Sequence, residues 1–270
     1  MKADRLPRVL SIAGSDSGGG AGIQADLKAF ARCGVHGMTA ITAITAQNTV
    51  AVTAVHQVPG DVVVEQVRAV VEDIGVDAVK IGMLGTRETI EAVGEALDLV
   101  GDAPVVLDPV MVAESGARLL DEDAEGELRT QVVPRAAVVT PNVPEARVLA
   151  GTGEREDDAE ALVRAVHALG PRAVVLTGGH RDEATDLYFD GERLVELPGE
   201  RYGGGSAHGS GCTHSSALAA HLALGLEPLE AARAAKRIAS EAVRDGLESI
   251  GRGPGAVDVF GLERRARERG

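Results

Sequence analysis

The clearest pattern along the chain is a series of short apolar runs, each followed by a polar or glycine-rich cluster and then by a segment with helical periodicity. Continuous apolar strands that alternate with helices are typical of a parallel sheet whose two faces are both covered. We therefore predict an α/β fold with a mostly parallel central sheet. The runs predicted as strands are residues 9–14, 38–46, 78–83, 104–107, 137–140 and 173–176.

Two further segments have strand patterns of a different kind. Residues 51–58 alternate in polarity, which predicts a hairpin partner or an edge flap. Residues 187–189 and 194–197 flank an Asp-Gly turn signal and predict a hairpin. No linker, repeat or low-complexity tract divides the chain, so residues 1–270 are predicted to form a single domain. The main helices are predicted at residues 23–33, 62–74, 86–100, 213–224 and 228–244.

The polar and glycine-rich clusters follow the carboxyl ends of the predicted strands. Ligands of open α/β sheets bind outside these ends. We expect the clusters to gather at one edge of the sheet and to form the functional site there. They contain Gln47, Met83, Asp108, Asn142 with Glu145, Thr177-Gly178-Gly179, and the loop that holds Cys212.

The strongest chemical signal is the glycine-rich stretch at residues 203–211, which leads through Cys212 into an apolar helix that Gly225 ends. Glycine-rich backbone at a helix N-terminus offers unpaired N–H groups beside the positive end of the helix dipole, which suits a phosphate or an oxyanion. The thiolate of Cys212 is expected to be favoured there, so Cys212 is a candidate base or nucleophile. A small core residue is the alternative interpretation of a free cysteine.

A second glycine-rich loop, residues 15–22, follows the first predicted strand. The dinucleotide fingerprint G-x-G-x-x-G does not fit, because Ala25 stands where the third glycine belongs. The P-loop is excluded because the chain contains no Gly-Lys pair. A tight turn between strand and helix is an equally good interpretation of these glycines.

Composition and charge limit the class of partner. The 270 residues are enough for a proper core, and 44% hydrophobic and 25% charged content is ordinary for a soluble domain. The net charge of −14 argues against a general nucleic-acid or anionic-membrane surface. Cys33 and Cys212 cannot form a disulfide framework, and no run approaches the roughly 18 apolar residues of a membrane span. We expect a reduced, soluble, cytoplasmic protein.

Two acidic residues, Asp108 and Glu145, each follow a predicted strand end. Singly, such a residue is commonly a helix cap or a solvated loop residue. Two of them beside a phosphate-binding helix predict a Mg²⁺ site, because Mg²⁺ takes one or two carboxylates plus substrate oxygens and waters.

The histidines leave other chemistry open. His208, Cys212 and His214 match no standard zinc spacing. A cysteine–histidine hydrolase is the competing reaction class, with His180, His208 or His214 as its base. A serine hydrolase is not supported, because G-x-S-x-G is absent. Cys33 is predicted to be structural, and the pattern around Lys236 predicts a solvated surface lysine.

Six segments of the chain share the motifs of one enzyme family. They are residues 13–28 (AGSDSGGGAGIQADLK), 44–49 (ITAQNT), 80–84 (KIGML), 108–111 (DPVM), 140–146 (TPNVPEA) and 208–213 (HGSGCT). In this order they resemble the hydroxymethylpyrimidine/phosphomethylpyrimidine kinases, the thiamine-pathway branch of the ribokinase-like superfamily. The resemblance implies a three-layer α/β/α domain, often a homodimer, that uses ATP and Mg²⁺ to phosphorylate a hydroxymethyl group and then the resulting monophosphate.

The resemblance also implies roles in substrate binding. Gln47 matches the family residue that hydrogen-bonds the aminopyrimidine. Gly14, Asp26, Met83 and Val110 match other residues of the same pocket.

In the catalytic loop, Gly209, Ser210, Gly211 and Cys212 match the anion hole of the family. Cys212 stands where most of the superfamily has an aspartate base. By this resemblance, Cys212 would accept the proton of the substrate hydroxyl as it attacks the γ-phosphorus. The second phosphorylation starts from an ionised phosphate oxygen and would depend less on the base.

The same resemblance implies which residues bind the nucleotide. Asn142 and Glu145 match the N-x-x-E motif that organises Mg²⁺ and phosphate, and Lys236 matches a lysine near the adenine. Thr177 and Gly179 match the nucleotide loop, in which many relatives carry lysine at the position of Thr177. Without that charge, phosphate neutralisation must depend on Mg²⁺, on backbone dipoles or on an arginine that the sequence does not place.

Two alternatives stay open at this point. Some relatives with this cysteine signature act on the vitamin B6 ring, and Gln47 could hydrogen-bond either heterocycle, so a pyridoxine or pyridoxal kinase is the nearest one. A non-catalytic pyrimidine-binding sensor is the other, and the presence of Cys212, Asn142 and Glu145 counts against it.

Overall fold

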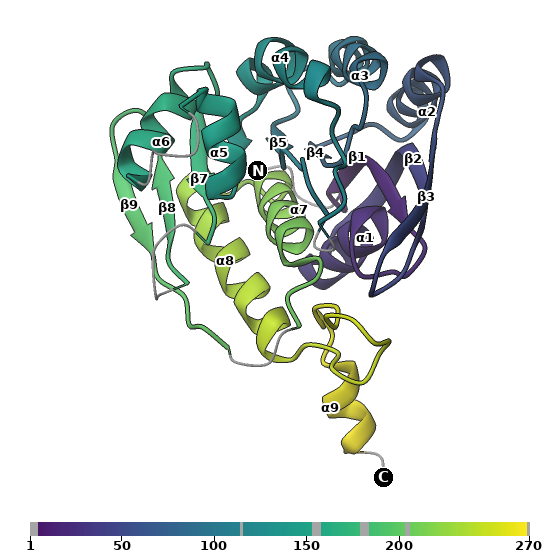
Figure 1. Ribbon diagram of the computed structural model, residues 1–270. Helices are drawn as coiled ribbons and strands as arrows, with labels where there is room; N and C mark the ends of the chain where they lie inside the picture. The colour runs from purple at the N-terminus through teal and green to yellow at the C-terminus, as the bar shows by residue number, and fades with distance from the viewer. Residues whose placement is uncertain (1–4, 114–115, 153–157, 179–183, 203–205, 269–270) are drawn as a thin grey trace.

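In the part of the chain that the structure describes, a nine-stranded sheet lies at the centre, with helices on both faces (Figure 1). The computed structural model describes residues 5–113, 116–152, 158–178, 184–202 and 206–268. The strand order is β3-β2-β1-β4-β5-β6-β7-β8-β9. The strands are β1 (Arg8–Asp16), β2 (His36–Gln47), β3 (Val52–Gln57), β4 (Ala78–Ile81), β5 (Val105–Leu107), β6 (Val138–Val139), β7 (Ala173–Leu176), β8 (Asp186–Phe189) and β9 (Leu194–Leu197).

The strands from β2 to β7 in this order run parallel, whereas β3, β8 and β9 pair antiparallel at the two edges. Parallel strands covered on both faces need apolar side chains at every position. In β7, for example, all four residues are apolar and buried. The predicted mostly parallel α/β sheet is therefore confirmed. Within the predicted segment 51–58, Val52–Gln57 form the edge strand β3, and the predicted hairpin is β8 with β9.

The helices divide between the two faces and complete the three layers (Figure 1). On one face, Phe30, Leu218 and Ala231 pack over apolar strand residues. The helices of this face are α1 (Gly22–Cys33), α7 (Ser210–Ala223) and α8 (Pro228–Arg244). The other face carries α2 (Gly60–Asp73), α3 (Arg87–Leu99), α5 (Val143–Ala150) and α6 (Ala159–His167). Shorter helices are α4 (Glu125–Glu127) and α9 (Leu262–Arg267).

The middle of helix α7 is buried on all sides, because every residue from Thr213 to Ala220 is buried. It begins at Ser210 rather than at the predicted Thr213. Gly209 adopts the left-handed conformation (φ 84°, ψ 8°) and turns the loop directly into the helix. Cys212 therefore lies within the first turn instead of before it.

The sheet topology explains where a ligand can enter. The chain leaves β1 through α1 to β2, and it returns through α2 to β4 on the opposite side of β1. The loops after β1 and β4 diverge at this switch point and open a crevice beyond the strand ends. No helix in the described ranges has the length and apolar character to cross a membrane.

Candidate functional site

A cavity of about 590 Å³ opens at the carboxyl ends of the parallel strands. Its volume is typical of a small-molecule site. The predicted gathering of the clusters at one edge is confirmed. Of the predicted site residues, those that line the cavity are Gly14, Gln47, Met83, Asp108, Val110, Asn142, Glu145, Thr177, Gly209, Ser210, Gly211, Cys212 and Lys236. Asp26 does not line it, and Gly179, His180 and residues 203–205 lie outside the described residues.

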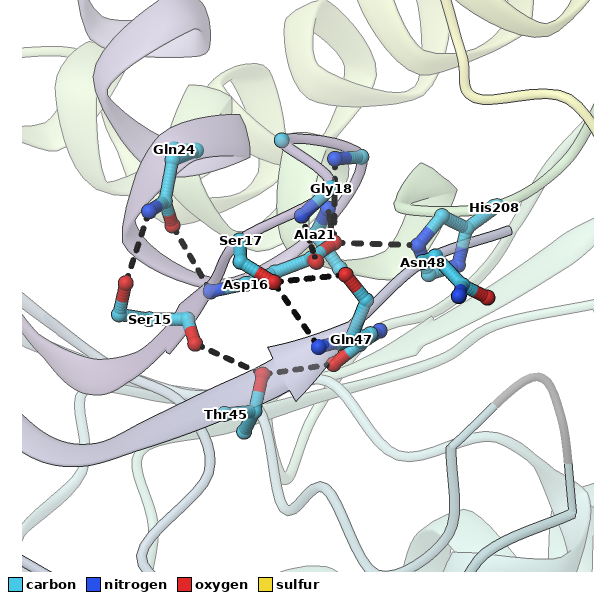
Figure 2. Close-up of polar contacts among 12 residues, drawn as sticks. Ser15, Asp16, Ser17, Gly18, Ala21, Gln24, Thr45, Gln47, Asn48 and His208 are labelled. Atoms are coloured by element: carbon cyan, nitrogen blue, oxygen red, sulfur yellow. Dashed lines mark hydrogen bonds and ion pairs between the residues drawn. The ribbon is translucent and has the colours of Figure 1, made fainter. Parts of the chain in front are cut away.

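Asp16, the last residue of β1, holds the first glycine-rich loop in place (Figure 2). Its carboxylate accepts hydrogen bonds from the backbone N–H groups of Gly18, Gly20 and Ala21 at 2.7, 3.1 and 2.8 Å. His208 Nε2 lies 3.3 Å from the same carboxylate. Burial alone would raise the pKa of Asp16, but the hydrogen bonds of His208, Ala21 and Gly18 keep it below its ordinary value. The ionised carboxylate is thus the stable form.

The two glycine-rich loops interlock around this carboxylate. A Cβ at Gly20 would lie 2.3 Å from His208 Cδ2, and a Cβ at Gly209 would lie 1.8 Å from the carbonyl oxygen of Gly20. Glycine is therefore required at both positions by close packing, and at Gly209 by the positive φ as well. This contact places the start of α7 against the loop after β1.

The first turn of α7 forms one wall of the cavity. The first N–H groups of a helix have no acceptor within the helix, and they lie at the positive end of its dipole. A Cβ at Gly211 would have Asp108 Oδ2 at 3.8 Å as its nearest neighbour, so the backbone of this turn is open to a ligand. The geometry suits an anion, as the sequence predicted.

The thiol of Cys212 does not have the acidity that was expected. Burial raises its pKa to about 12; the Lys80 ammonium opposes this rise, and the carboxylates of Asp26 and Asp108 add to it. The prediction of a favoured thiolate is therefore wrong for the free protein, because desolvation of the charged form and the two carboxylates outweigh the favourable effect of Lys80. Cys33 is half-buried on α1, and burial raises the pKa of its thiol to about 11.

Asp26 lies behind Lys80 and has no exposed surface. Lys80 Nζ donates to both of its oxygens at 2.9 and 3.0 Å, and the hydroxyls of Ser11 and Ser216 donate at 2.6 and 2.8 Å. The expectation that Asp26 lines the substrate pocket is corrected here, because the carboxylate is engaged in a buried ion pair. Burial by itself lowers the pKa of Lys80, but attraction to Asp26, Cys212 and Asp108 raises it above its ordinary value. Lys80, which lines the cavity, stays charged.

Gln47, at the end of β2, faces the end of the cavity that Gly14 and Met83 line. Its side-chain oxygen accepts a hydrogen bond from Thr45 Oγ1 at 3.2 Å, and its backbone N–H donates to Ser17 Oγ at 2.9 Å (Figure 2). A Cβ at Gly14 would lie 3.1 Å from Met83 Sδ, so glycine at this position lets the Met83 side chain pack closely against the end of β1. This end of the cavity combines one oriented amide with apolar walls.

Asn142 and Glu145 form a reciprocal capping box at the start of α5. Glu145 N–H donates to Asn142 Oδ1, and Asn142 N–H donates to Glu145 Oε2, both at 2.9 Å. Burial raises the pKa of Glu145 to about 8 and Asp108 adds to the rise, against backbone donors from Asn142 and Met111. Burial also raises the pKa of Asp108, although Lys80 opposes it. The two predicted metal ligands are thus close enough to repel each other.

At the far end of the cavity, Thr177 follows β7 and its backbone N–H donates to the Pro141 carbonyl at 2.8 Å. Lys236 reaches this end from α8, and its Nζ donates to Asp186 Oδ1 at 2.7 Å. The side chain of Lys236 is only 13% exposed. The expectation of a solvated surface lysine is therefore wrong, because the ion pair with Asp186 draws it into the cavity.

Three charged residues of the site were not found from the sequence: Asp16, Lys80 and Asp186. Lys80 carried a signal, because a charged residue inside the apolar run 78–83 must have a buried counterion or a function. Asp16 and Asp186 stand beside glycine-rich or strand segments and had no signal of their own.

Comparisons with known proteins identify a family and several relatives that this chain is similar to. The family model described as phosphomethylpyrimidine kinase matches residues 16–258. A relative from Rhizobium meliloti (strain 1021), named hydroxymethylpyrimidine/phosphomethylpyrimidine kinase, is 51% identical over 257 residues, which cover 93% of this chain and 96% of the relative.

Two solved structures are similar over most of the chain. The pyridoxal kinase from Staphylococcus aureus in complex with AMP-PCP and pyridoxal has a TM-score of 0.86 and 34% identity, and the match covers 96% of both chains. The phosphomethylpyrimidine kinase from Clostridium difficile 630 has a TM-score of 0.77 and 41% identity, covering 88% of this chain and 99% of that chain.

Proposed function

The chain belongs to the phosphomethylpyrimidine kinase family, and we propose that it transfers the γ-phosphoryl group of ATP to 4-amino-5-hydroxymethyl-2-methylpyrimidine and then to the resulting monophosphate. This is the family that the six sequence segments predicted. One observation carries the proposal: the start of α7, which suits an anion, and the amide of Gln47 beside the apolar Met83 line the same cavity.

The residues of this chain supply the parts that phosphoryl transfer needs. The first turn of α7, from Gly209 to Cys212, would stabilise negative charge on the transferring phosphoryl group with its backbone N–H groups. Cys212 Sγ would accept the proton of the hydroxymethyl oxygen. Since the free protein holds the thiol, the thiol proton must first leave to solvent, and the buried positive charge of Lys80 favours that loss.

The acidic pair fits a divalent cation. Asp108 and Glu145 both line the cavity, and a bound cation would relieve their mutual repulsion. We assign Mg²⁺ to these carboxylates, with water and substrate oxygens as its other ligands. When bound, Mg²⁺ would neutralise charge on the phosphates. The described residues contain no group of three or more His, Cys, Asp or Glu side chains placed to hold a metal, so a zinc-type site is less suitable.

The nucleotide is assigned to the end of the cavity lined by Thr177 and Lys236. The similar Staphylococcus aureus kinase was solved with AMP-PCP, which supports ATP as the phosphoryl donor. The expected homodimer and the cytoplasmic location stay predictions.

The test of the reaction is ATP consumption with hydroxymethylpyrimidine, its monophosphate and pyridoxal at matched concentrations, with the products identified by mass. We expect turnover of both pyrimidines. A pyridoxal kinase is not favoured, because the relative named for the pyrimidine reaction is 51% identical and the pyridoxal kinase structure is 34% identical. Turnover of pyridoxal alone would reverse this assignment, and turnover of none of the three would favour the sensor.

The role of Cys212 is tested by Cys212→Ser, with Cys33→Ser as the matched control. The first phosphorylation should fall more than the second, because only the first needs a base. In the unsubstituted enzyme, the first rate should also rise as the pH increases above neutrality, since the thiol must lose its proton. Equal losses in the two steps would contradict the assignment of Cys212 as the base.

A further inference from the structure

His214 is a buried polar residue that the mechanism above does not use. It lies on α7, lines the cavity and is 4% exposed. Neither of its ring nitrogens has a hydrogen-bond partner among the described residues. Burial lowers the pKa of the imidazole, which Asp186 opposes and Lys236 reinforces, so the ring is neutral and offers one N–H donor and one acceptor. A buried donor and acceptor without hydrogen-bond partners cost free energy of folding unless a ligand forms hydrogen bonds with them.

Polar side chains from three elements meet at this point. Asp186, on β8, accepts hydrogen bonds at Oδ1 from Lys236 Nζ of α8 at 2.7 Å and from the backbone N–H of Gly178 at 2.9 Å. Its Oδ2 lies 3.8 Å from His214 Nε2, which is too far for a hydrogen bond. The imidazole and the carboxylate thus stand side by side without bonding, and both line the cavity.

This cluster adjoins two parts of the cavity wall, the first turn of α7 and one face of α8. The anion-binding first turn of α7 precedes His214 on the same helix. One face of α8 lines the cavity, and along it the charged Lys236 is followed by small or apolar side chains. The residues of that face are Lys236, Ala239, Ser240 and Val243. In a nucleotide, the ribose adjoins the phosphates, so a nucleotide whose phosphates bind the first turn of α7 would bring its ribose next to this cluster.

We propose that His214 and Asp186 bind the ribose hydroxyls of the nucleotide, with Lys236 and the Gly178 N–H fixing the Asp186 carboxylate. A carboxylate repels phosphate but accepts hydrogen bonds from hydroxyls, and a neutral imidazole N–H donates to a hydroxyl oxygen. The ligand class is therefore a ribonucleotide rather than a deoxyribonucleotide. This inference rests on the proposed kinase function, but nucleotide binding tests it without any pyrimidine.

The experiment measures binding of ADP, 2′-deoxy-ADP and 3′-deoxy-ADP by calorimetry to the full chain and to two variants. His214→Leu removes both ring nitrogens. His221→Leu is the matched control, because His221 lies on the same helix, has Nδ1 within 2.7 Å of the Ala217 carbonyl and does not line the cavity. The unsubstituted protein should bind ADP about five- to tenfold more tightly than at least one deoxy analogue. His214→Leu should lose this preference and bind ADP more weakly by a similar factor, whereas His221→Leu should keep both.

Three results would overturn the assignment. If His214→Leu binds ADP as tightly as the unsubstituted protein and keeps the preference for ADP over the deoxy analogues, His214 is an ordinary core residue. Equal weakening for all three nucleotides would place the contact away from the ribose. If His214→Leu does not fold, the unsubstituted protein still tests the proposal, because equal affinity for ADP and both deoxy analogues would decide against it. His214→Gln, which keeps an N–H donor, should retain the preference for ADP. Failure of the kinase proposal would instead be seen as ADP binding without turnover of any pyrimidine.

Discussion

The buried ion pair between Lys80 and Asp26 leads to a quantitative prediction about stability. Both side chains are 0% exposed, and two hydrogen bonds of 2.9 and 3.0 Å join them. Lys80→Met keeps the length of the side chain but leaves Asp26 without its counterion. Removing one partner of a buried pair typically costs about 3–5 kcal/mol, because the other charge stays desolvated. Since Ser11 and Ser216 still donate to Asp26, we expect a loss of about 3 kcal/mol.

A double variant separates the uncompensated charge from the lost packing. In Lys80→Met with Asp26→Asn, the neutral amide keeps polar partners and no isolated charge is buried. The double variant should therefore recover about 2 kcal/mol relative to Lys80→Met alone. The matched surface control is Arg68→Met, since Arg68 pairs with Glu65 at 3.1 Å and both side chains are exposed. That change should cost less than about 1 kcal/mol.

The assay is urea unfolding followed by far-ultraviolet circular dichroism, because the chain has no tryptophan to report by fluorescence. The free energy of unfolding should fall in the order unsubstituted protein, Arg68→Met, double variant, Lys80→Met. A loss below about 1 kcal/mol in Lys80→Met, or a double variant no more stable than the single one, would refute the reasoning about an uncompensated charge.

Three further predictions concern the loop contact and the acidic pair. Gly209→Ala forces a Cβ to 1.8 Å from the Gly20 carbonyl oxygen. The control is Gly225→Ala at the other end of α7, where φ is also positive but a Cβ meets nothing within 4 Å. Thermal unfolding should show a clearly larger loss of stability for Gly209→Ala, and equal losses would contradict the interlocking of the loops. Burial raises the pKa of Glu145 from 4.5 to about 8, so the folded state binds this proton more tightly and stability should fall as the pH rises through that window. Glu145→Gln should flatten the fall in unfolding curves measured across the window, and an unchanged slope would show that other groups cause it. Asp108→Asn should raise the Mg²⁺ concentration for half-maximal turnover at least about tenfold, and an unchanged Mg²⁺ dependence would remove Asp108 from the metal site.

The sheet and the edge that carries the site were predictable because they depend on local patterns. A run such as residues 173–176 is apolar at every position, and only a strand covered on both faces needs that composition. Once the strands are parallel, their carboxyl ends must lie together, so Gln47, Asp108 and Thr177 meet in one cavity although they are far apart in the chain. Local pattern and topology were sufficient for this part.

The charge state of Cys212 was not predictable in the same way. The helix N-terminus is visible in the sequence, and it alone favours a thiolate. The opposing effect comes from burial and from Asp26 and Asp108, which approach from other elements. Desolvation depends on the complete packing around a group, and no spacing rule contains it. The same limit applies to Asp26, whose neighbour Lys80 is separated from it by the whole of β2, β3 and α2.

Lys236 brings a positive charge to the end of the cavity where Thr177 has none, but its ion pair with Asp186 neutralises that charge. Thr177 has no positive charge to offer to a phosphate, and the sequence did not show what replaces the lysine of many relatives. Lys236 arrives at the same end of the cavity from α8 and is held by Asp186, which also accepts the N–H of Gly178, next to Thr177. An ion pair of this kind leaves the nucleotide end nearly neutral, so it favours polar hydroxyls over phosphate. The phosphate charge must then be met at the start of α7 and by the cation that we propose for the acidic pair.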